Sequence, residues 1–235
     1  MSQTLPRAPL LAAWAGAWIR GEAALDDLLS GLGPEHQVVV AMPGTDGAEP
    51  LGLALGALRR AGATGFSAAL PVPGDPIGLG GPVHFNAAAV DAGEAVLVEA
   101  VGLGLVPVQV GSAVEWRCSP AAAAPWVDLD EAALVLRQTL LDVTACLVAL
   151  DVATWQPEIP DALMNLRHRP PPPLPRTYDG RRIETVERAL LCLDIVDLAR
   201  RVEPGAVTAM EADARRAALV DLDRAARRAL VAACR

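Results

Sequence analysis

The chain has no lysine among its 235 residues, and its twenty basic side chains are all arginine. This absence excludes a Schiff base with a carbonyl substrate or pyridoxal phosphate, and it excludes a lysine nucleophile. It also removes the phosphate-binding lysine of Walker motifs and the lysine of protein kinases. Asparagine and tyrosine are scarce as well. Because all three residues have codons rich in A and T, the composition is typical of a GC-rich genome and favours a bacterial source.

Excess positive charge and clustered metal ligands are missing too. The formal net charge is −8, whereas nucleic-acid binders need clustered basic residues. The four cysteines lie far apart, without a CxxC motif or a close Cys/His pair, so we expect no metal and no cofactor. Buried, reduced thiols in a cytoplasmic protein explain them best. They are Cys118, Cys146, Cys192 and Cys234.

Long uncharged apolar runs are absent. No stretch approaches the ~20 apolar residues that a membrane-spanning helix requires. The apolar segment Leu10–Ile19 follows a single basic residue, Arg7, and acidic residues come soon after it. This pattern favours an N-terminal helix over a signal peptide. We therefore predict a cytoplasmic protein with no membrane partner.

What the chain does contain is a large hydrophobic fraction, 52%, which is ample for a core. The order strand–helix–strand–helix–strand over residues 37–101 predicts right-handed crossovers and a parallel core to the sheet. Two further strands joined by tight turns are expected to be antiparallel. We predict an α/β (or α+β) fold with a mixed sheet of about five strands and flanking helices. The expected strands are 37–42, 66–72, 95–101, 105–110 and 113–118.

The second half of the chain reads as mostly helical. A capping box at 128–131 begins a helix that runs to about residue 150, and its few polar side chains predict that it is largely buried. Prolines then interrupt the chain, and two amphipathic segments, 183–202 and 211–234, predict an αα-hairpin. The expected domains are an α/β domain over 1–168, a Pro-rich linker over 169–180, and a helical hairpin over 181–235 that packs on the body or on a partner.

Charge is distributed unevenly along the chain. Residues 1–168 carry a net charge of −11 and residues 169–235 a net charge of +3. A basic tail and an acidic body predict docking, either within one chain or across a dimer. The alternative is a solvated helix face with many ion pairs, and we favour this alternative.

The best candidate site is the loop Pro73–Pro82, which follows the second expected strand and precedes a short helix. Glycine amides and a helix N-terminus at the carboxyl edge of a sheet favour an anion. Asp75 and His84 are candidates for acid–base chemistry, and Asn86 for an amide donor. The alternative is a structural turn stiffened by prolines.

Asp46, in the loop after the first expected strand, would join this site if both strands end at the same edge. The predicted ligand-binding residues are Asp46, Asp75, Gly78, Gly80, Gly81, His84 and Asn86, and no catalytic residue is assigned. Two weaker candidates are Cys118, beside Arg117, as a reactive thiol, and the SH3-ligand pattern of Arg169–Pro175. For Cys118 we favour strand packing, and for the Pro-rich pattern we favour a linker or a segment that packs on its own body.

Taken together, these features favour a non-catalytic scaffold, regulatory or ligand-binding protein that self-associates. The expected partners are a second copy and a small anionic ligand. The surface for self-association would be an apolar stripe in the last helix. The alternative is a small-molecule enzyme, a hydrolase or transferase acting on an anionic substrate in a crevice near Asp75 and His84. The stripe comprises Leu219, Leu222, Ala226 and Leu230.

Overall fold

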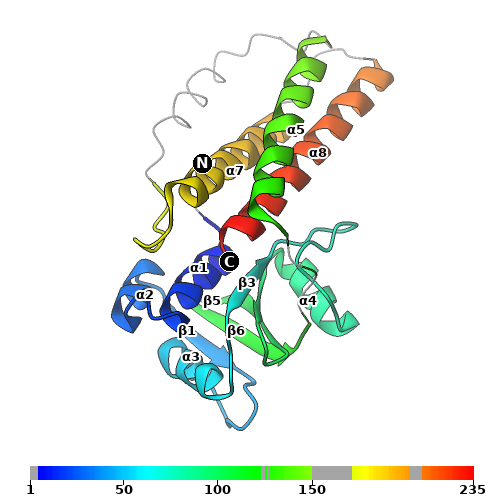
Figure 1. Cartoon of the computed structure of the whole chain (residues 1–235). Helices are drawn as coiled ribbons and strands as arrows, with labels where there is room; N and C mark the ends of the chain where they lie inside the picture. Colours follow the sequence, from blue (N-terminus) through cyan, green and yellow to red (C-terminus); the bar gives the residue numbers. More distant parts are fainter. Residues whose placement is uncertain (1–4, 123–124, 126, 150–170, 202–207) are drawn as a thin grey trace.

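The structure is a computed structural model, and it describes residues 5–122, 125, 127–149, 171–201 and 208–235. In this part of the chain, helices flank a six-stranded mixed sheet, and three long helices project from it (Figure 1). The fold class is therefore α/β, as predicted. The helices are α1 (Arg7–Ile19), α2 (Leu25–Gly31), α3 (Leu51–Arg60), α4 (Val83–Ala92), α5 (Leu129–Ala149), α7 (Gly180–Arg201) and α8 (Ala209–Ala233).

All five expected strands are present, and a sixth, of two residues, pairs with the first. The sheet order is β2-β1-β6-β5-β4-β3. The predicted parallel core is wrong, because β1 with β6 is the single parallel pair among the described strands. The strands are β1 (His36–Val40), β2 (Glu49–Pro50), β3 (Phe66–Ala69), β4 (Ala95–Val98), β5 (Leu103–Val110) and β6 (Ala113–Pro120).

The connection between β3 and β4 explains this error. A helix between two strands implies a parallel pair only when the chain returns to the end at which the first strand began. Here the loop 70–82 and α4 bring the chain back at the end where β3 finishes, so β3 and β4 pair antiparallel, with Ala69 opposite Ala95. The sequence shows the helix but not the path of the loop.

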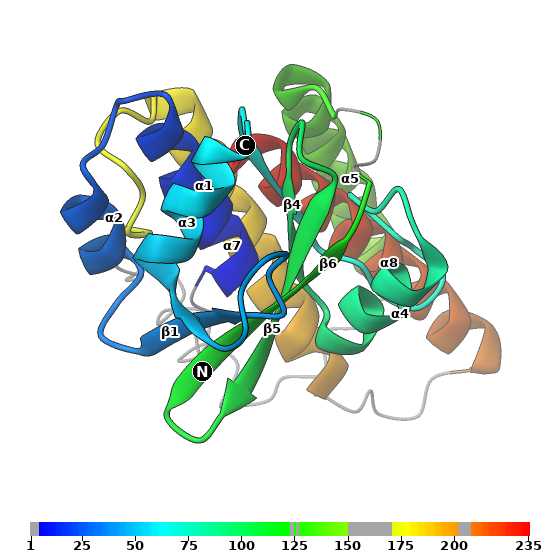
Figure 2. The same cartoon turned by 90° about the horizontal axis from the view of Figure 1, so that it is seen from below.

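The sheet is covered on both faces, and β4 shows how. Val96 and Val98 belong to the larger hydrophobic core, which includes residues of α1, whereas Ala95 and Leu97 belong to a smaller core with residues of α4. This alternation follows from the two-residue period of a strand. Figure 2 shows α1 and α4 on different sides of the strands.

The α7–α8 pair packs within the same chain. The apolar stripe predicted to make a dimer is buried, with Leu222 1% and Leu230 0% exposed. The prediction that this stripe is a self-association surface is therefore wrong, because the stripe forms part of the core that α8 shares with α5, α7 and the body. The basic tail contacts the acidic body through ion pairs such as Arg227–Asp75 and Arg235–Glu99, and it also carries exposed pairs along its own helices, such as Arg188–Glu184.

The described part of the Pro-rich segment lies against the body. The Pro173 carbonyl accepts a hydrogen bond from the Trp14 indole at 2.8 Å, and Leu174 packs on the main core. Arg169 and Pro170 of the SH3-ligand pattern lie outside the described residues. The described prolines are thus held against the body by contacts of Pro173 and Leu174.

Helix α5 differs from its prediction. Its start is as expected, since the Asp128 carboxylate accepts hydrogen bonds from the amides of Asp130 and Glu131. Its expected burial is wrong, because several large apolar side chains are exposed, among them Leu134 and Leu141. None of the described helices is long and apolar enough to cross a membrane.

Candidate functional site: the Gly/Pro loop and the outer helices

Two backbone amides of the Gly/Pro loop after β3 already donate hydrogen bonds within the chain. The Gly80 amide donates to the Ala122 carbonyl at 2.9 Å, and the Gly81 amide donates to the Asn86 side chain at 3.1 Å. Gly78 has φ +86°, and a Cβ there would lie 2.7 Å from the Ala69 backbone. The glycines therefore serve close packing and internal bonding, and His84 stays exposed at the start of α4.

Asp75 holds the last helix onto this loop. Its carboxylate accepts a hydrogen bond from Arg227 at 2.9 Å and lies 3.3 Å from Arg224. The Arg227 side chain is only 9% exposed, and it also donates to the Leu70 carbonyl and to Asp223, each at 2.8 Å. Asp75 and Arg227 thus form a largely buried ion-pair cluster with a structural role.

Asp46 does not join the other predicted site residues. Strands β1 and β3 run in opposite directions with three strands between them, so the loops that follow them lead toward opposite ends of the sheet. The structure brings together Asp75, Gly78, Gly80, Gly81, His84 and Asn86 in one segment, and places Asp46 elsewhere as an exposed residue. Anion binding by the loop stays a prediction.

That prediction can be tested by thermal shift. If the loop binds an anion, phosphate or sulfate should raise Tm, although the amides of Gly80 and Gly81 already have acceptors within the chain. A change of less than about one degree would leave the loop as a structural turn. A ligand at ~100 times its Kd would add about 2.7 kcal/mol, which is several degrees for a chain of this length. A rise of several degrees that disappears in His84→Ala would show that the loop does bind an anion.

The buried thiols are poor nucleophiles in this fold. Burial raises the pKa of Cys118 to about 11 and that of Cys192 to about 11. A reactive thiol needs an exposed thiolate, so the structure favours the packing role expected for Cys118. No group of three His, Cys, Asp or Glu side chains that could hold a metal ion exists among the described residues.

A hollow of about 540 Å³ lies where the end of α1 meets the start of α7. The buried Tyr178 hydroxyl beside it has no hydrogen-bond partner within the described segments, and burial raises its pKa. Four of the charged residues around it form two ion pairs, and Arg182 donates to the carbonyls of Ala233 and Arg235, so this hollow is a polar joint between the C-terminal helices and α1. The ion pairs are Arg20–Glu22 and Arg235–Glu99, each at 2.9 Å.

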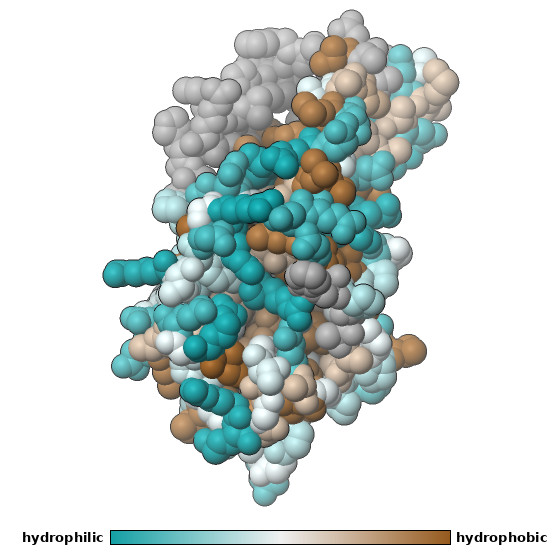
Figure 3. Space-filling model, viewed as in Figure 1, coloured by the Kyte–Doolittle hydropathy of each residue, from teal (hydrophilic) through white to brown (hydrophobic). Residues whose placement is uncertain are grey.

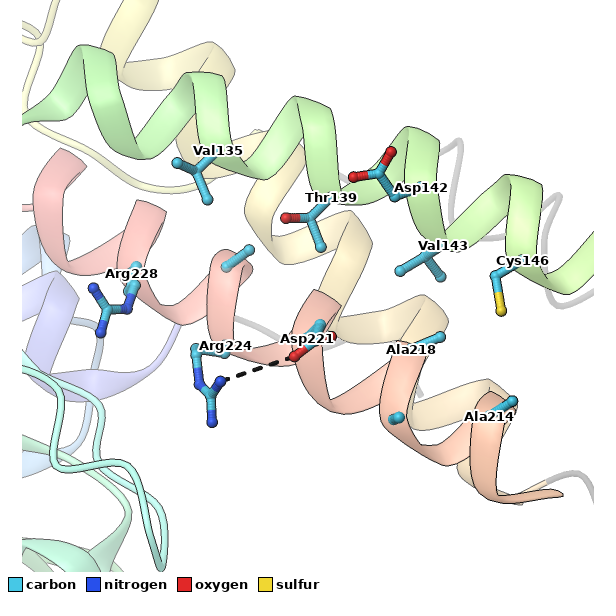
Figure 4. A pocket seen from close by; sticks show the side chains of 12 residues that line it. Val135, Thr139, Asp142, Val143, Cys146, Ala214, Ala218, Asp221, Arg224 and Arg228 are labelled. Atoms are coloured by element: carbon cyan, nitrogen blue, oxygen red, sulfur yellow. Dashed lines mark ion pairs between the residues drawn. The ribbon is translucent and has the colours of Figure 1, made fainter. Parts of the chain in front are cut away.

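An open groove of about 580 Å³ runs between α5 and α8 (Figure 4). Val135, Thr139 and Val143 of α5 point toward α8 across it. The α8 side is lined by Asp221, Arg224 and Arg228 and by small residues, which let another helix or large side chains approach closely. Such a groove suits packing more than chemistry. The small residues are Ala214, Ala217, Ala218 and Ala225.

The outer face of α5 carries a further feature, which we call the α5 stripe. It consists of Leu134, Gln138, Leu141, Ala145 and Val148, all exposed. The three large apolar members are 58%, 65% and 75% exposed in chain order. Figure 3 shows hydrophobic surface following α5 between hydrophilic residues. Alternating steps of four and three residues place all five on one side of a helix.

Sequence reasoning missed both the Arg227 cluster and the α5 stripe. Asp75 and Arg227 are 152 residues apart, and no local pattern indicates that they meet. The stripe did have a signal, the regular spacing of Leu134, Leu141 and Val148 at seven residues. That spacing does not stand out in the sequence, because α5 is apolar on its inner side as well.

Comparison with known proteins identifies a family. Residues 8–130 match the N-terminal domain of Rv1486c-like proteins, and residues 130–231 match their C-terminal domain. The boundary falls at the start of α5, which packs against α8. No curated protein and no solved structure matches the chain. Because the two matches together span most of its length, the chain belongs to the Rv1486c-like protein family.

Proposed function

We propose that this protein is a non-catalytic scaffold or regulatory protein that self-associates through the outer side of α5. The observation that carries the proposal is the α5 stripe, a row of large apolar side chains exposed on a well-formed helix. Scattered exposed apolar residues are ordinary, but a row with a regular spacing indicates a contact surface.

The position of α5 supports this role. In Figure 1 the helix projects away from the sheet, and in Figure 2 it lies at the margin of the molecule. Its inner side packs on α8 through residues such as Leu136 and Val143, which are 0% and 5% exposed. The stripe lies on the opposite side, where a second molecule can approach it.

The residues first considered for catalysis support a non-catalytic role. Asp75 is engaged by Arg227 and Arg224, and Asp46 lies at a different end of the sheet from His84. An acid and a base that act together must lie within hydrogen-bonding reach of one substrate. Asp46 and His84 do not meet this condition.

Measurement of molar mass tests the proposal. We expect the wild-type protein to approach twice the mass of one chain as its concentration rises, and Leu141→Asp to keep the mass of one chain. Because Leu141 is 65% exposed, the variant should keep its helical circular dichroism and its Tm. Leu53→Asp on α3 is the matched control, since Leu53 is 63% exposed but far from the stripe, and its mass should equal the wild type's.

Light scattering or sedimentation over a wide concentration range gives the answer. A wild-type protein that keeps the mass of one chain up to roughly 1 mM would have a dimer affinity weaker than about 4 kcal/mol, and the proposal would fail. It would fail equally if Leu53→Asp, rather than Leu141→Asp, produced the monomer.

A further inference from the structure

We infer that two copies pair through α5 as a short, parallel, two-stranded coiled coil. This inference rests on the proposed self-association and specifies its geometry. The α5 stripe has the spacing of a coiled-coil seam, with Leu134, Leu141 and Val148 at d positions and Gln138 and Ala145 at a positions. The stripe spans 14 residue steps, about 21 Å of helix.

The residues of the seam favour two strands in one register. Leucine occupies two of the three d positions, which is common in parallel dimers, and a single polar residue at a fixes register and strand number at some cost in stability. Gln138 is that residue, and in a parallel pair it meets the same glutamine of the partner. Ala145 allows the helices to come close near the far end of the seam.

Charge distinguishes the parallel from the antiparallel arrangement. Arg137 occupies a g position and Asp142 the e position five residues later. In a parallel coiled coil, g of one helix faces e of the next heptad in the other, so the two-fold axis creates two Arg137–Asp142 ion pairs. In an antiparallel pair, g faces g and e faces e, and neither ion pair can form.

Both charged side chains are in place for this contact. Asp142 already lies along the stripe, because it accepts a hydrogen bond from the Gln138 side chain at 3.1 Å. Arg137 is exposed and has no ion pair with any residue in the described part of its own chain. A second copy supplies the acid that Arg137 lacks.

A seam of five layers is small, so the dimer should be weak. Protein pairs with interfaces at the low end of the size range associate with modest affinity, so the fraction of dimer depends on the protein concentration. We therefore expect half-association at micromolar rather than nanomolar concentrations.

Disulfide crosslinking tests the direction of the pair. In a Cys146→Ala background, which removes the one described cysteine that is not buried, Leu134→Cys and Val148→Cys are made separately. In a parallel pair each new cysteine faces itself, so both variants should form dimers on mild oxidation, reversed by reductant. Disulfides require Cα atoms within about 7 Å, so two self-contacts some 21 Å apart exclude an antiparallel pair.

The control is Leu53→Cys in the same background, which should remain monomeric on oxidation. If the two α5 variants crosslink only when mixed with each other, the pair is antiparallel and the inference is wrong. If the wild type is dimeric in solution but neither variant crosslinks, α5 is not the seam. In that case the proposed self-association through α5 fails together with its geometry, whereas the antiparallel result would leave self-association through α5 in place.

Charge exchange tests the register independently. Arg137→Asp and Asp142→Arg each replace both ion pairs by like-charge contacts, and each should weaken the dimer roughly five- to tenfold in Kd. The double variant exchanges the two charges and should return to within about twofold of the wild type. Loss of affinity in the single variants without recovery in the double variant would overturn the parallel register.

Discussion

Replacing Arg227 with methionine should lower the free energy of unfolding by about 3–5 kcal/mol. The guanidinium donates to Asp75, Asp223 and the Leu70 carbonyl, and its side chain is only 9% exposed. Methionine fills a similar volume but leaves two carboxylates, 12% and 14% exposed, without this partner. Removing one member of a buried ion-pair cluster lowers the free energy of unfolding by more than the net contribution of the intact cluster, because the remaining charges stay desolvated and unpaired. For a chain of this length, Tm should fall by about 10 °C.

Urea unfolding followed by circular dichroism measures this effect. The matched control is Arg216→Met on the same helix, whose ion pair with Asp213 is exposed at 71% and 69%. Exposed pairs contribute about 0–1 kcal/mol, so this variant should unfold almost like the wild type. Equal effects of the two substitutions would show that Arg227 does not hold α8 to the body.

The Arg227 cluster also shows how far charge patterns in a sequence can be read. The uneven charge left two readings open, docking of the tail on the body and a solvated helix face, and the structure contains ion pairs of both kinds. The same reasoning placed Asp75 in a ligand site, because an acid in a glycine-rich loop has several possible partners. Its partner is set by the packing of α8, which brings together residues far apart in the sequence.

The positions of the strands could be predicted from the sequence, but their order and direction in the sheet could not. Runs of β-branched and small apolar residues predicted β1 and β4 within a few positions, because strand preference depends on neighbouring residues. Strand order and direction depend on where a loop leads the chain. The loop 70–82 and α4 return the chain at the end where β3 finishes, so β3 and β4 are antiparallel. Asp46 is separated from His84 because β1 and β3 run in opposite directions with three strands between them.

Helix α5 shows why composition alone does not give burial. Its start and length follow from the Asp128 cap and from helical spacing. Its apolar content predicted a buried helix, yet Leu141 and Val148 are among the most exposed large residues. A helix that is apolar on two sides is either a core helix or the surface of an assembly. In the structure, one of the two sides has no neighbour among the described residues.

Removing residues 180–235 should make the remaining fragment, 1–179, insoluble or aggregated. The C-terminal helices share one continuous core with the sheet and α1, and that core includes Val186, Leu190 and Leu230, each at most 1% exposed. Without these residues the fragment presents a large apolar surface to water, far beyond the patches of ordinary monomers.

Co-expression of 180–235 as a separate chain is the matched control and should restore soluble protein, because it restores the same contacts. Size-exclusion chromatography and thermal melts measure both results. A monomeric fragment that melts cooperatively would show that the sheet and its flanking helices are complete without α7 and α8.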